Sequence, residues 1–236
     1  MVMEKMTGNT DLSTADSSWK SLYKIAGIAA LLMAIFIPVQ IIVFILWPPP
    51  ETTLGWFELF RNKPFIGLLD LDLLLIVDQI LVGIIMIALY YLLRKANPSL
   101  MAIALLLAVL GIAAYFASTA AFEMLTISNK FHAARTMLEK SMYESAGQAV
   151  LAAWQGTAFN FGYVMEGIGL LLTAIVMLKS RIFGKFTAWV GIVVGVMALL
   201  PPTAGTVGMI FALGSLVPLE IWDILVARRL FQLSRK

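Results

Sequence analysis

The chain has 236 residues, of which 61% are hydrophobic and 13% are charged, and its formal net charge is +3. A soluble globular domain has roughly 45–50% apolar and about 25% charged residues, so this composition excludes an ordinary soluble domain. At about 20 apolar residues per transmembrane helix, the length accommodates roughly six spans with short connections. The sequence therefore predicts an all-α fold, a polytopic bundle of six transmembrane helices whose surroundings are a lipid bilayer.

The residue types that are missing exclude several kinds of chemistry. Without cysteine, the chain has no disulfide framework, no thiolate nucleophile and no thiolate metal ligand. The only histidine, His132, falls in a predicted outer loop, which disfavours a Ser–His catalytic pair and bis-histidine haem ligation. No Walker A or GxGxxG sequence occurs. Basic residues border the apolar segments, which favours membrane topology over a nucleic-acid partner.

The N-terminal part of the chain contains one predicted span. Residues 1–21 are polar and rich in Ser, Thr and Asp, which predicts a cytoplasmic tail without packed structure. The first apolar segment covers residues 22–47 and stops at three consecutive prolines, which cannot continue a helix. Residues 51–64 mix aromatic and charged side chains, which fits a short helix in the membrane interface or an aromatic-rich loop equally well.

Further apolar segments predict the remaining spans, at residues 66–93, 100–127, 151–178, 186–200 and 203–227. The segment 186–200 is short, so neighbouring residues must help it cross or the bilayer must thin locally. Alternatively, 186–227 forms one broken re-entrant unit around Pro201 and Pro202. Residues 128–148 predict an interfacial or capping helix on the non-cytoplasmic face, and a basic cytoplasmic tail, 228–236, ends the chain.

The basic residues are distributed unequally between alternate connections. Twelve lie in the two terminal tails, at Lys24 and at residues 94–95 and 179–185, whereas five lie in the connections on the opposite side. Cytoplasmic loops carry the excess of Lys and Arg in membrane proteins. Six spans with both termini in the cytoplasm are therefore predicted.

Acidic residues occur within the apolar segments: Asp70, Asp72, Asp78, Glu123, Glu166, Glu220 and Asp223. A charged side chain at the bilayer centre costs about 2.5–3.5 kcal/mol on insertion scales, so such residues usually face the bundle interior and mark functional paths. Asp70 and Asp72 lie near the outer start of their span, where they could sit at the lipid headgroups. Asp223 precedes Arg228 closely enough to reach the inner interface. A structural role is favoured for these last three acids.

Glu166 lies nearest to the middle of its predicted span. It belongs to a stripe with spacings of three and four residues, which places the members on one helical face: Gln155, Phe159, Gly162, Glu166, Gly169 and Thr173. Tyr163 and Asn160 lie beside that face. A similar stripe in the segment 66–93 consists of Asp72, Gln79, Gly83, Met86 and Tyr90, with Asp78 at its edge. Small and polar residues in such stripes could equally serve helix packing.

Buried acids become tolerable when they are protonated or when a bound cation supplies the missing charge. The sequence therefore predicts an acid-lined cavity that binds or translocates a small cation, a proton or a cationic solute. Glu166 is its central carboxylate, Asp78 and Glu123 form the outer approach, and Glu220 forms the inner approach. Tyr163, Asn160, Gln155 and Gln79 complete the predicted binding residues. The identity of any metal or cofactor stays open.

Two other classes of function remain as alternatives. A membrane sensor or accessory protein would bind a lipid or a partner helix without transport. A carboxylate-dependent lipid enzyme is less favoured, because no paired-acid motif of the DxxxD kind is evident, and no catalytic residue is assigned. Packing glycines such as Gly191 and Gly195 could serve within one chain or between chains, which leaves a homo-oligomer open.

Two stretches carry a family resemblance. The segment Gly205 to Phe231, GTVGMIFALGSLVPLEIWDILVARRLF, and the segment KIAGIAALL at residues 24–32 resemble uncharacterised prokaryotic six-span membrane families of the domain-of-unknown-function type. The resemblance implies a multi-pass protein of a bacterial or archaeal inner (cytoplasmic) membrane, and it carries no site residues.

Overall fold

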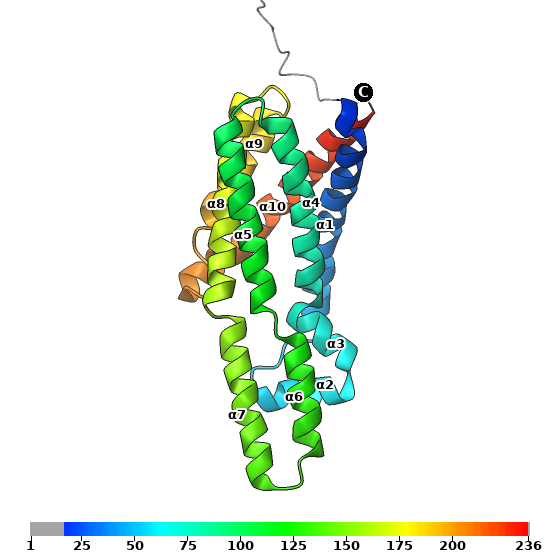
Figure 1. Ribbon diagram of the computed structural model, residues 1–236, viewed down its shortest axis with the longest axis vertical. Helices are drawn as coiled ribbons and strands as arrows, with labels where there is room; N and C mark the ends of the chain where they lie inside the picture. Colours follow the sequence, from blue (N-terminus) through cyan, green and yellow to red (C-terminus); the bar gives the residue numbers. More distant parts are fainter. Residues whose placement is uncertain (1–16, 236) are drawn as a thin grey trace, which may run out of the picture.

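The computed structural model describes residues 17–235, and every regular element within them is helical, which confirms the all-α prediction. Residues 1–16 of the predicted N-terminal tail lie outside the described residues. The main bundle consists of α1 (Lys20–Leu46), α4 (Leu74–Leu93), α5 (Pro98–Ser118), α8 (Thr157–Lys179), α9 (Lys185–Met197) and α10 (Gly205–Ser234) (Figure 1).

The helices of the main bundle pack in a ring that follows the order of the chain. Helix α1 packs on α4, α4 on α5, α5 on α8, α8 on α9 and α9 on α10. Helix α10 then returns to α1, and this contact closes the ring. Successive helices of the ring run in opposite directions, as Figure 1 shows. Because the ring is closed, its helices surround one interior space.

The outer surface of the ring is apolar. Ile35 on α1, Leu106 on α5 and Val217 on α10 are among many large hydrophobic side chains that are exposed. Such extensive exposed apolar surface is rare in soluble monomers and is expected where helices face lipid. Within the described residues, five helical stretches are long and apolar enough to cross a membrane, and α9 is a shorter apolar helix of 13 residues. The chain is therefore a multi-pass helical membrane protein.

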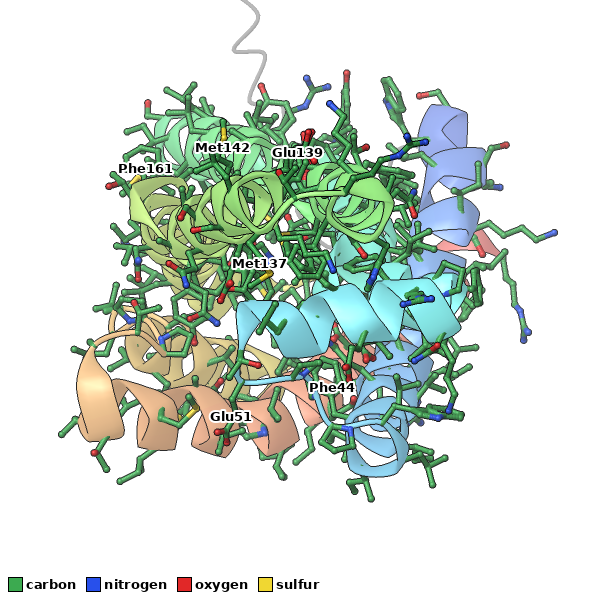
Figure 2. The ribbon with its side chains drawn as sticks, turned by 90° about the horizontal axis from the view of Figure 1, so that it is seen from below. Phe44, Glu51, Met137, Glu139, Met142 and Phe161 are labelled. Atoms are coloured by element: carbon green, nitrogen blue, oxygen red, sulfur yellow. The ribbon has the colours of Figure 1, made fainter. Side chains whose placement is uncertain are left out.

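A second group of helices lies at one end of the ring. It comprises α2 (Thr53–Asn62), α3 (Pro64–Leu68), the π-helical turn η2 (Leu69–Leu73), α6 (Ala121–Ala133) and α7 (Met137–Trp154), and we call it the cap (Figure 1). Figure 2 looks onto this end and shows α2 lying across the molecule, while α6 and α7 are seen end-on. The cap has its own small core, built around Phe57, Phe60 and Met124.

Two of the predicted spans are interrupted in the structure. In the segment 100–127, α5 ends at Ser118 and α6 begins at Ala121; in the segment 151–178, α7 ends at Trp154 and α8 begins at Thr157. The stretch from α5 to α6 has 36 residues and would be about 54 Å long as one straight helix, whereas the hydrocarbon core is about 30 Å thick. The breaks therefore separate the ring from the cap.

Local capping interactions explain other boundaries. The segment 51–64 forms the helix α2, and the side chain of Thr52 accepts a hydrogen bond from the backbone of Gly55 at its start. The segment 128–148 is not one helix, because Thr136 and Glu139 form a capping box that starts α7 after a turn. Such a box satisfies backbone N–H groups that the first helical turn leaves free.

At its two ends, α10 also differs from the predicted boundaries. Gly205 at its start has a φ of +72°, a conformation that glycine adopts without strain, which lets the chain turn sharply after the prolines. At the other end, α10 continues to Ser234 through the predicted tail 228–236. It does so because Leu230 and Leu233 are buried in the main core.

Candidate functional site

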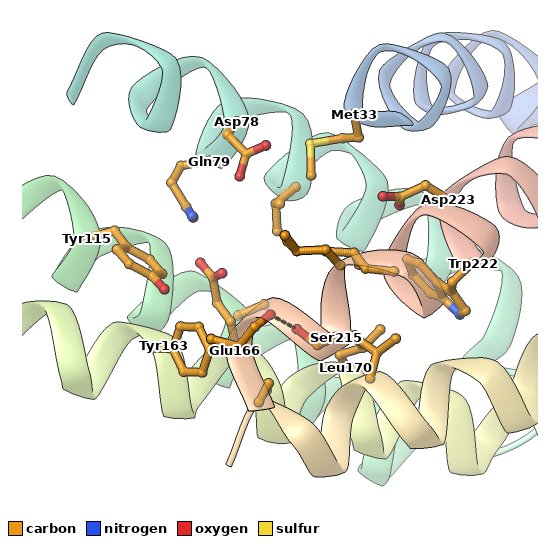
Figure 3. Close-up of a pocket in the computed structure, with 18 of the residues that line it drawn as sticks. Met33, Asp78, Gln79, Tyr115, Tyr163, Glu166, Leu170, Ser215, Trp222 and Asp223 are labelled. Carbon is orange, nitrogen blue, oxygen red and sulfur yellow. Dashed lines mark hydrogen bonds between the residues drawn. The ribbon is translucent and has the colours of Figure 1, made fainter. Parts of the chain in front are cut away.

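A cavity of about 400 Å³ lies inside the ring, and side chains from every helix of the ring line it. This volume falls within the range of about 300–1,000 Å³ that is typical of small-molecule sites. Most of the lining is apolar. The exceptions are the polar or acidic side chains Asp78 and Gln79 on α4, Tyr115 on α5, Tyr163 and Glu166 on α8, and Ser215 and Asp223 on α10 (Figure 3).

Glu166 reaches the cavity at the contact between α5 and α8. A Cβ atom added to Gly111 on α5 would lie 2.6 Å from Cγ of Glu166, so only glycine leaves room for the Glu166 side chain there. The amide group of Gln79 points toward the Glu166 carboxylate from α4 (Figure 3). One carboxylate oxygen of Glu166 and the amide oxygen of Gln79 are buried without a hydrogen-bond partner.

Asp78 and Asp223 approach the same cavity from α4 and α10 (Figure 3). Asp78 lies within electrostatic range of both Glu166 and Asp223. Asp223 is only 1% exposed, and its Oδ2 atom has no hydrogen-bond partner. We call Asp78, Glu166 and Asp223 the acid trio. No lysine, arginine or histidine is among the described residues that line the cavity, so the trio has no basic partner there.

Aromatic side chains form another part of the lining. Tyr163 on α8 hydrogen-bonds Ser215 on α10 (Figure 3). Tyr115 contacts the ring of Phe159 edge-to-face, with 5.5 Å between ring centres. The indole of Trp222 also lines the cavity and lies against Gly191 of α9, where a Cβ atom would come within 2.6 Å of its nitrogen. Aromatic faces of this kind attract cations as well as apolar groups.

Four of the residues predicted from the sequence come together in this cavity: Asp78, Gln79, Tyr163 and Glu166. Glu123 does not join them, because it lies exposed in the first turn of α6, in the cap. Glu220 is half-buried on α10 with one unpaired oxygen, but it is not among the residues that line the cavity. The predicted outer and inner approaches through Glu123 and Glu220 therefore do not open directly onto the cavity.

Gln155 and Asn160 are also outside the lining. Gln155 is exposed between α7 and α8, so the predicted helical stripe does not include it. The amide nitrogen of Asn160 donates to the backbone carbonyl of Gly156 at 2.8 Å, and its side-chain oxygen accepts a hydrogen bond from Thr203. Asn160 thus ties the start of α8 to the turn before α10, which is a structural role.

The sequence interpretation missed Asp223 as a cavity residue. It assigned Asp223 to the inner interface because Arg228 follows closely in the sequence. The sequence does contain a signal for this position of Asp223. Ser215, Leu219 and Asp223 are spaced by four residues and therefore lie on one face of a helix. All three line the cavity.

Asp70 and Asp72 are both buried inside the protein. The Asp72 carboxylate accepts hydrogen bonds from the backbone N–H groups of Ala120 and Ala121 and from the indole of Trp154. It therefore holds the start of α6 and the end of α7 against η2. Neither carboxylate oxygen of Asp70 has a hydrogen-bond partner.

The acids of the chain do not form a metal-ion cage. Among the described residues, no group of three or more His, Asp or Glu side chains is placed to hold a metal ion. The members of the acid trio instead project from three different helices into one cavity (Figure 3). The separation of the three carboxyl groups suits a ligand larger than a bare ion, or protons on separate carboxyl groups.

Residues 25–227 match the model of a protein family described as a domain of unknown function (DUF4386). The match covers the cap and all of the ring except the start of α1 and the end of α10, and it confirms the resemblance to an uncharacterised family. No curated protein matches the chain. No solved structure matches it either.

Proposed function

We propose that the chain, which belongs to the DUF4386 family, binds or translocates a small cation, a proton or a cationic solute through the cavity inside the ring. The acid trio carries this proposal, because three carboxyl groups face one cavity that no described basic side chain lines. An unpaired carboxylate in an apolar interior costs several kcal/mol. A proton or a bound cation offsets that cost.

The proposed membrane placement uses α1, α4, α5, α8, α9 and α10 as six spans. Both termini then lie in the cytoplasm of a prokaryotic cell, and the cap lies on the opposite side of the inner membrane. The unequal division of the basic residues, twelve against five, supports this orientation. With 13 residues, α9 is about 20 Å long, so residues that flank it must complete its span.

A flux measurement in liposomes tests the proposal. Purified protein is reconstituted, a pH or ion gradient is imposed, and the flux of protons, Na⁺, K⁺ and organic cations is recorded. Wild-type protein should carry at least one of these ions, and Glu166→Gln should reduce that flux to the level of empty liposomes. The matched control is Glu58→Gln. Glu58 is exposed on α2, so this substitution makes the same chemical change outside the cavity.

The absence of flux in wild-type protein for all these ions would contradict translocation. Binding of the same cations, measured by calorimetry, would then separate a binding protein from one that recognises no cation. If the protein neither binds nor moves cations, the sensor or accessory function is favoured, in which the bundle binds a lipid or a partner helix.

A further inference from the structure

The cavity combines separated carboxyl groups with apolar and aromatic walls, and this combination defines a ligand class. We infer that its ligand is an organic ammonium ion with an apolar body. This inference rests on the proposed function and narrows it to one kind of cation.

The charged part of such a ligand matches the acid trio. Divalent cations such as Ca²⁺ need six to eight oxygen ligands around one point, and Mg²⁺ needs a nearly ideal octahedron. The described acids do not converge in this way. An ammonium group needs fewer partners, and Glu166 with the neighbouring Gln79 provides oxygen acceptors that currently have no donor. Asp78 adds negative charge within electrostatic range.

Asp223 provides a second, independent indication of a ligand. Its side chain is buried and aimed into the cavity, yet Oδ2 has no hydrogen-bond partner (Figure 3). Gln79 is 2% exposed, and its amide oxygen also has no hydrogen-bond partner. Buried polar atoms in folded proteins nearly always have partners. A ligand with N–H donors supplies the partners that the protein lacks.

The apolar part of the ligand matches the walls. Met33, Leu170 and Trp222 line the same cavity as the carboxyl groups (Figure 3). An inorganic ion loses part of its hydration shell beside such side chains, which is unfavourable. An apolar body is stabilised there in proportion to the apolar area that it buries. Tyr115, Tyr163 and Trp222 add ring faces that attract an ammonium group.

The cavity also reaches the lipid-facing surface. Met209 and Leu213 on α10 belong to the lining and are 48% and 60% exposed. These residues also line a second hollow beside Pro202 and Thr203. An amphiphilic cation that partitions into the bilayer could therefore reach the cavity along α10 without crossing the cap.

A binding comparison tests the inference on the full chain in detergent or nanodiscs. Calorimetry measures the affinities of phenethylammonium, of phenylethanol, which has nearly the same shape without the charge, and of K⁺. Phenethylammonium should bind at least about tenfold more tightly than phenylethanol, as expected for a charged hydrogen bond. Asp223→Asn and Glu166→Gln should each remove most of this difference, whereas Glu58→Gln should preserve it.

The wild-type comparison needs no variant, so a folding defect cannot obscure it. Equal affinity for the amine and the alcohol would overturn the inference, because the carboxyl groups would then play no part in recognition. Binding or flux of K⁺ or protons without binding of phenethylammonium would overturn the inference and leave the proposed function intact. Failure to bind or move any cation would overturn both.

Discussion

The hydroxyl group of Tyr163 on α8 donates a hydrogen bond to Ser215 on α10, across the cavity inside the ring. The direction of this bond follows from the neighbouring contact, because the Ser215 hydroxyl already donates to the backbone carbonyl of Ala212 at 2.7 Å. Helix α8 packs mainly on α5 and α9, so this bond connects it to a helix on another side of the cavity.

A double-mutant cycle measures that connection. Tyr163→Phe and Ser215→Ala should each destabilise the protein, and their coupling should be about 0.5–1.5 kcal/mol, the usual net contribution of a hydrogen bond. Reversible unfolding in mixed micelles provides the free energies of the two single variants and the double variant. Strictly additive effects would show that the two hydroxyl groups do not interact in the membrane protein.

Substitution by asparagine should destabilise the protein at Asp72 but not at Asp70. Asp72→Asn keeps one acceptor oxygen but replaces the other with an NH₂ group, so either the indole of Trp154 or the start of α6 loses its acceptor. We expect a destabilisation of about 1–3 kcal/mol, the cost of leaving buried donors unpaired.

Asp70→Asn is the matched control, because both oxygens of Asp70 are buried without partners. Removing an unpaired buried charge should be neutral or stabilising. Thermal unfolding in detergent compares the two variants, and limited proteolysis between α6 and α7 reports whether the cap loosens. Equal destabilisation by both substitutions would contradict the assigned role of Asp72.

Gly111→Ala should disturb the contact between α5 and α8. A Cβ at this position would lie 2.6 Å from Cγ of Glu166 and 3.0 Å from the carbonyl oxygen of Gly162. Alanine favours a helix over glycine by about 1 kcal/mol, but overpacking typically costs about 1–3 kcal/mol, so the net effect should be destabilising. Gly83→Ala is the control, since its Cβ would make only an ordinary 3.5 Å contact with Ile112. A stabilised Gly111→Ala would show that the two helices are not in close contact.

The proposed topology can be tested by cysteine labelling. The wild-type chain has no cysteine, so it gives no background labelling. Single-cysteine variants at Ala134, in the turn of the cap, and at Ala204, between α9 and α10, should react with an impermeant maleimide on intact cells. Lys95→Cys should react only after the membrane is opened. Labelling of Ala204→Cys only in opened membranes would mean that α9 does not cross, as the re-entrant alternative predicts.

The helical membrane class of this protein could be predicted without a structure. In a bilayer every backbone N–H and C=O must find a partner within the chain, so apolar segments of this length form helices. Helical periodicity also sufficed to place Glu166 and Tyr163 on one side of α8, because residues three and four apart share a face. Both line the cavity, as do Asp78 and Gln79.

The tertiary structure decided where the long apolar segments break and which acids share a space. The start of α6 depends on the carboxylate of Asp72, which is 48 residues away from Ala120 in the sequence and invisible to local helix signals. Asp223 lines the cavity while Glu220 does not, although both lie on α10. That choice depends on how α10 is rotated about its own axis, and the rotation is set by its packing on α1 and α9.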